Sequence, residues 1–234
     1  MIACIAVVPY PPLLVPALTV RADAETARLR GACSRAVSSL TERAAEWVAV
    51  GVDRTGPTVL GPDTAGTFAG FGRDVRVTLG GTAATDPELP LPALITGLLR
   101  EQAGAGSASV RLLAPDTPAE ESWRLGESLA AETDGLLVLA DGSNCTDERS
   151  PHPPDERASG LDEQIRTALA EVDTAQLQAL DPQLCAELGV EGRAALQVLP
   201  GAVAASGGTW RGELLYSATP YGVTYHVATW TRQP

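Results

Sequence analysis

Short, uninterrupted apolar runs alternate along this chain with longer amphipathic stretches, and this alternation limits the folds that the chain can adopt. Residues 2–8, 47–52 and 135–140 contain no charged side chain, which is typical of strands buried on both faces of a sheet. Residues 20–45 instead repeat apolar side chains every three to four positions, as one face of a helix does. The alternation predicts an α/β fold of three layers, α/β/α, around a mixed, mostly parallel sheet.

The other segments extend the same scheme. Five of the ten aromatic residues lie at or beyond position 210, where residues 213–217 and 224–231 predict a closing antiparallel hairpin. Residues 56–72, rich in Gly, Pro and Thr, and residues 80–90 are expected to be irregular. Further strands are expected at 75–79 and 110–113, and further helices at 91–102, 118–132, 161–172, 175–188 and 193–205, the last interrupted at Pro200-Gly201. No internal repeat or linker is visible, so residues 1–234 are interpreted as one domain.

The charge balance narrows the classes of function. All 17 basic residues are arginine, and 29 acidic residues give a net charge of −12. Such a surface repels phosphate groups, so neither a nucleic acid nor an anionic membrane is an expected partner. The absence of lysine excludes a Schiff-base or P-loop lysine mechanism.

The cysteines and the N-terminal segment bear on the compartment. The four cysteines are far apart and form no CxxC pair, which favours buried, reduced thiols. The first charged residue is Arg21, and four prolines between positions 9 and 16 break the early apolar stretch. This pattern fits neither a secretory signal nor a membrane span and predicts a cytoplasmic protein.

Three segments that follow buried strands are the expected site, because ligands in α/β sheets bind beyond the carboxyl ends of the strands. These segments are residues 9–16, 51–56 and 141–157. The first contains Pro9-Tyr10-Pro11-Pro12, and the third opens with Asp141-Gly142-Ser143-Asn144.

These motifs resemble those of a known enzyme family, the class III extradiol ring-cleavage dioxygenases. The strand and proline turn at residues 2–16, the strand and turn at 137–144, and the segments 189–194 and 220–223 are similar to the protocatechuate 4,5-dioxygenase beta-subunit family and to its Memo-like relatives. The resemblance spans nearly the whole chain. It implies a single LigB-type domain with a phosphorylase/hydrolase-like three-layer fold and non-haem Fe(II) chemistry on aromatic rings.

The family site holds Fe(II) with two histidines and a carboxylate, and a further histidine is the acid/base group. In this chain Tyr10 stands at the position of the first ligand histidine, and Asn144 at that of the acid/base histidine. Asp53 and Arg54 follow the strand that would deliver the second histidine. The carboxylate position falls near Ala194, with Glu191 as the nearest acid. All four roles therefore have a different side chain.

The resemblance thus implies a degenerate, non-catalytic homologue that binds a small, aromatic molecule without a cofactor. We expect Tyr10, Asp53, Asn144 and Glu191 to converge at the strand ends, and the cleft to include Asp141 and Ser143. The alternative is an active Fe(II) oxidoreductase that cleaves a catechol-type ring with a rearranged ligand set. That set would combine His152 with Asp53 or Glu191 and with Tyr10.

Other readings of the same residues remain open. A zinc or iron site in the cleft is another hypothesis, with Cys145, His152 and either Asp53 or Asp141 as ligands. Ser143 lacks the Gly-x-Ser-x-Gly context of a serine nucleophile. His226, the other histidine, is expected on an exposed strand face. The aromatic hairpin either covers its own sheet or joins a second copy or a partner subunit.

Overall fold

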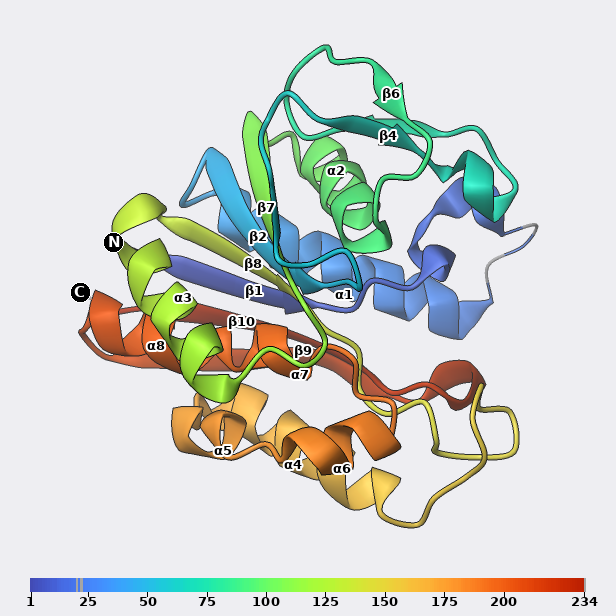
Figure 1. The fold of residues 1–234 in the computed structure, drawn as a ribbon, viewed down its shortest axis with the longest axis vertical. Coiled ribbons are helices and arrows are strands. Elements are labelled where there is room, and N and C mark those ends of the chain that lie inside the picture. The colour runs from blue at the N-terminus through green and yellow to red at the C-terminus, as the bar shows by residue number, and fades with distance from the viewer. Residues whose placement is uncertain (20, 22, 234) are drawn as a thin grey trace.

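The computed structural model describes residues 1–19, 21 and 23–233, and its centre is a seven-stranded mixed sheet (Figure 1). The strand order is β3-β7-β2-β8-β1-β10-β9. Four neighbouring strands run parallel, and β3 and β10 are antiparallel to them at the two sides. The bounds are β1 Cys4–Val8, β2 Glu46–Val52, β3 Thr58–Leu60, β7 Ser107–Leu113, β8 Gly135–Leu139, β9 Trp210–Ala218 and β10 Tyr225–Arg232.

Helices cover both faces of this sheet, as the alternation of apolar runs predicts. Successive residues of a strand point to opposite faces. In β1, Cys4, Ala6 and Val8 therefore join one core layer, while Ile5 and Val7 join the other. The first layer packs against α1 (Ala24–Thr41) and α2 (Leu91–Ala103). The second packs against α3 (Ala119–Glu132), α4 (Ala158–Glu171), α5 (Thr174–Gln178), α6 (Pro182–Glu187), α7 (Arg193–Leu196) and α8 (Val198–Ser206).

The region expected to be mostly irregular forms a second, small sheet. It consists of β4 (Ala65–Thr67), β5 (Arg76–Thr78) and β6 (Thr85–Asp86). The strand expected at 75–79 is thus present, but in this small sheet. Strands of two or three residues are too short to show a hydrophobic period, so the sequence pattern did not predict β3, β4 or β6.

Two predicted helices are divided differently in the structure. The segment 175–188 forms α5 and α6, because the Asp181 carboxylate accepts a hydrogen bond from Leu184 N (2.7 Å) and Pro182 starts a new helix. The segment 193–205 divides at Gln197, between α7 and α8, rather than at Pro200-Gly201. Pro200 lies in the first turn of α8, where its missing N–H removes no helical hydrogen bond.

The first helix begins later than its apolar spacing predicts. Asp23 is the N-cap, and its carboxylate accepts a hydrogen bond from Thr26 N (2.8 Å). Residues 20 and 22, within the predicted range, lie outside the described residues, as does residue 234. Among the described helices, none has the length and apolar character needed to cross a membrane.

The C-terminal hairpin forms as predicted, and its aromatic side chains mainly cover the protein's own sheet. Tyr225 and Trp230 are buried, one in each core layer, whereas Tyr221 in the turn is exposed. His226 was expected on an exposed face, and that prediction is wrong, because the side chain is only 3% exposed. The strand alternates between two covered faces, and His226 lines a hollow together with Glu163 and Arg166 of α4.

Candidate functional site

A cleft of about 870 Å³ lies where the parallel strands end, and all three segments singled out in the sequence contribute to it. Tyr10 follows β1, Val52 ends β2 with Asp53 and Arg54 directly after it, and Cys145 and residues 152–155 come from the loop after β8. This volume is within the range of small-molecule sites. The remaining lining residues are Leu91, Pro92, Pro115, Pro182, Cys185, Ala186, Glu187, Gly189, Val190, Glu191 and Arg193.

Tyr10 is a buried polar residue of the lining. Its backbone N donates a hydrogen bond to Asp141 Oδ1 (3.0 Å), which ties the end of β1 to the end of β8. The residue is 8% exposed, and no other described residue forms a hydrogen bond with its hydroxyl. Burial raises the pKa of Tyr10 well above its usual value, and the nearby Asp141, Glu191 and Asp53 raise it further. The phenol therefore stays protonated and neutral.

Asp141 lies behind the lining rather than in it. The residue as a whole is only half-buried, yet the protein atoms packed around its carboxylate desolvate it. This desolvation, together with Glu191, raises the pKa of Asp141 to about 7, against the lowering effect of the Tyr10 N–H. Asp141 thus holds the backbone of Tyr10 in place, and it gains a negative charge as the pH rises through about 7.

Ser143 and Asn144 hold the loop together and do not line the cleft. Ser143 is 0% exposed, its Oγ donates to Leu188 O (2.7 Å), and its N donates to Asp162 Oδ1 (2.8 Å). Asn144 packs so closely against Gly189 that a Cβ there would lie 1.8 Å from Asn144 Oδ1. The expectation that Ser143 faces a ligand is therefore wrong because its side chain is fully buried, whereas Asn144 is partly exposed beside the lining residue Gly189.

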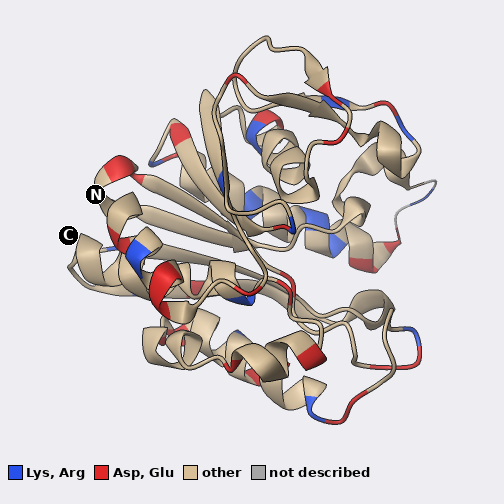
Figure 2. Cartoon of the chain, viewed as in Figure 1, with Lys and Arg blue, Asp and Glu red and all other residues tan. Residues whose placement is uncertain are grey.

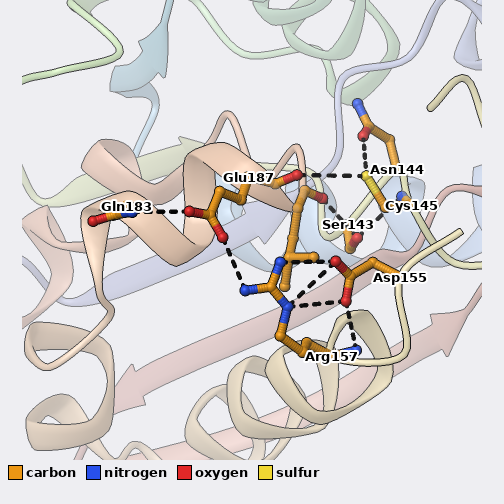
Figure 3. A network of polar contacts seen from close by, with 8 residues as sticks. Ser143, Asn144, Cys145, Asp155, Arg157, Gln183 and Glu187 are labelled. Carbon is orange, nitrogen blue, oxygen red and sulfur yellow. Dashed lines mark hydrogen bonds and ion pairs between the residues drawn. The ribbon is translucent and has the colours of Figure 1, made fainter. Parts of the chain in front are cut away.

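One wall of the cleft is the loop after β8, which an ion-pair network fastens to α6 (Figure 3). Arg157 pairs with Asp155 (2.8 Å) and with Glu187 (2.9 Å), and Gln183 donates to Glu187 (2.9 Å). The Arg157 hydrogen bond lowers the pKa of Asp155 to about 2. Both wall carboxylates are thus already paired. His152 lies on the exposed rim of this wall.

Two arginines line the cleft, and one of them is buried while the other is exposed. Arg193 is 3% exposed and donates to Pro115 O (2.9 Å), Thr117 O (2.9 Å) and Gln197 Oε1 (2.6 Å). Arg193 thus links α7 to the segment before α3, a role that the sequence pattern did not predict. Arg54 is exposed at the rim. Charged residues lie mainly on helices and connecting loops, and the central strands carry few (Figure 2).

The residues of the cleft do not fit the Fe(II) centre that the family resemblance implies. Among the described residues, no group of three or more His, Cys, Asp or Glu side chains is placed to hold a metal ion. Of the four residues expected to converge, Tyr10, Asp53 and Glu191 line one cleft, and His152 also lines it, whereas Asn144 does not.

No family model matches the chain, and no curated protein matches it. Among solved structures, the chain is similar to the crystal structure of an uncharacterized protein, JW3007, from Escherichia coli K12. The two share 16% sequence identity with a TM-score of 0.55, and the match covers 98% of this chain and 99% of that chain. At this identity the likeness concerns the fold alone. The chain therefore has the mixed α/β fold of that bacterial protein along almost its entire length.

Proposed function

We propose that this protein binds a small aromatic molecule in the cleft, as a non-catalytic homologue of the class III extradiol dioxygenases with their LigB-type fold. The observation that carries the proposal is the state of Tyr10. It occupies the position that the resemblance gives to an iron-binding histidine, its ring is buried in the cleft, and its hydroxyl has no partner among the described residues. Such a group is suited to bind a ligand rather than a metal.

The walls support an aromatic ligand. Five prolines line the cleft, and with Leu91, Val52 and Val190 they offer flat apolar surface to a ring. The neutral Tyr10 hydroxyl can donate a hydrogen bond to one polar substituent of that ring or accept one from it. The cleft thus combines apolar walls with polar and charged side chains that can orient a ligand.

Metal analysis and oxygen uptake test the non-catalytic part of the proposal. Protein purified without a histidine tag is expected to contain iron and zinc well below one atom per chain. It is also expected to consume no oxygen with catechol or protocatechuate after Fe(II) is added. One transition metal per chain, lost in the His152→Ala variant, together with ring-cleavage absorbance, would instead establish the active Fe(II) enzyme.

Calorimetry with a neutral phenol tests the binding part. Tyrosol, 4-hydroxyphenylethanol, is expected to bind at one site per chain. Binding should be lost when Gly189 is replaced by leucine, because the new side chain meets Asn144 and enters the lined space. Since that glycine has a φ of 68°, the variant's folding is first checked by circular dichroism, and Pro92→Trp serves as a second blocking variant. Unaltered tyrosol binding in a folded blocking variant would place the ligand elsewhere.

A further inference from the structure

The charges that remain unpaired in the cleft indicate which ligands it prefers. Of the four acidic lining residues, Asp155 and Glu187 are paired with Arg157. The other two are Asp53 and Glu191. Asp53 Oδ1 accepts hydrogen bonds from Thr55 N (2.9 Å) and Thr55 Oγ1 (2.7 Å), which leave its charge in place. No ion pair to either carboxylate is found among the described residues.

The lining also contains two arginines, Arg54 and Arg193, and among the described residues neither forms an ion pair with Asp53 or Glu191. The Arg193 guanidinium is buried and already donates to two backbone carbonyls and to Gln197. Arg54 is exposed, as is Glu191. Asp53, Glu191 and the half-buried Asp141 raise the pKa of the Tyr10 phenol, whereas neither arginine of the lining is among the charges that shift it. These acidic side chains therefore concentrate negative charge around Tyr10, and the chain's net charge of −12 adds to it.

We infer that the cleft selects aromatic amines, with the ligand's ammonium group facing Asp53 and Glu191 and its ring against the proline walls. Tyr10 lines this cleft, and because its hydroxyl has no hydrogen-bond partner among the described residues, a ligand can donate to it or accept from it. The ring of Tyr10 adds a surface that attracts cations. This inference rests on the proposed function and names the ligand class for the same cleft.

Three probes with the same phenol and the same two-carbon arm test the inference. Tyramine has a cationic end, tyrosol a neutral one, and 3-(4-hydroxyphenyl)propionate an anionic one. By isothermal titration at pH 7 and low salt, tyramine is expected to bind about tenfold more tightly than tyrosol, with the propionate weakest. Added salt should reduce the tyramine affinity more than the tyrosol affinity.

A charge-neutral variant supplies the matched control. Glu191→Gln keeps the size of an exposed side chain and is expected to weaken tyramine about three- to fivefold more than it weakens tyrosol. Glu156→Gln changes an equally exposed carboxylate outside the lining and should change neither affinity. Equal affinities for all three probes would overturn the inference and leave the proposed function standing. Failure of every probe to bind would remove the proposed function as well.

Discussion

Tyr10 has a hydroxyl that no other described residue engages, so its role in binding can be separated from its role in folding. Tyr10→Phe is expected to leave thermal unfolding unchanged within about 1 °C, since no protein hydrogen bond is lost. The same variant should weaken tyrosol about fivefold, which corresponds to one hydrogen bond to the ligand. Parallel calorimetry and thermal scans measure both effects. A marked drop in melting temperature with unchanged affinity would show that the hydroxyl stabilises the fold instead.

Two buried titratable groups give the stability of the protein opposite dependences on pH. Burial first, and then Glu191, raises the pKa of Asp141 from 3.8 to about 7, so folding opposes its ionisation. The contribution of Asp141 therefore lowers the free energy of unfolding as the pH rises from 4 to 7, by about 4 kcal/mol at most. Burial, and then Arg166, lowers the pKa of His226 from 6.5 to about 4. Its contribution is complete above pH 6.5 and declines by about 3 kcal/mol as the pH falls to 4.

Single variants are expected to separate these two slopes. Asp141→Asn retains an acceptor for Tyr10 N, and its free energy of unfolding should rise with pH between 4 and 6.5. His226→Asn should show the reverse, a decline between pH 4 and 7. The wild-type protein should vary less than either variant between pH 4 and 6.5. Urea unfolding at half-unit pH steps measures all three proteins, and parallel curves for the three would show that neither group titrates as described.

At the scale of elements, glycine allows α3 and α8 to pack with their backbones in contact. A Cβ on Gly126 would lie 2.1 Å from Val198 O, and one on Gly201 would lie 2.0 Å from Trp123 O. Neither contact can be relieved by rotating a side chain, because both acceptors belong to the backbone. The helices would have to move apart and open the second core layer.

Gly126→Ala is therefore expected to lower the free energy of unfolding by about 3 kcal/mol. The control is Gly160→Ala, since Gly160 is an exposed glycine of α4 with no atom within 4 Å of an added Cβ. That change should stabilise the protein by about 0.5–1 kcal/mol through helix propensity. Denaturant midpoints with unchanged slopes measure both values. Equal effects of the two substitutions would contradict the close packing of α3 on α8.

The long elements were predictable for a physical reason. Each of the apolar runs that form β1, β2 and β8 is long enough to show burial on both faces, and the helical stripe of α1 spans several turns. Short elements contain too few residues to show a hydrophobic period. Only the structure therefore revealed the small sheet of β4, β5 and β6 and the division between α5 and α6. Asp181 capping a new helix before Leu184 is a local signal that could have predicted that division.

At the scale of the whole molecule, the cleft follows from the sheet. Parallel strands end at one edge, so Tyr10, Asp53 and Cys145 meet there although they are distant in the chain. The position of the site was therefore predictable from the buried, mostly parallel strands that the sequence suggests. Its inner surface was not, because α6 and the loop after β8 reach it through the Arg157 ion pairs and not through any sequence period.

The sequence by itself determined the α/β class, the helices on both faces, the closing hairpin and the edge of the sheet where the cleft lies. These depend on hydrophobic periodicity and on the geometry of parallel strands, both of which are local. Only the tertiary structure decided that Ser143 and Asn144 support the cleft from outside it, that His226 is buried, and that Asp53 and Glu191 keep their charge unpaired. Desolvation and charge pairing depend on neighbours distant in the chain, and the fold alone determines which those neighbours are.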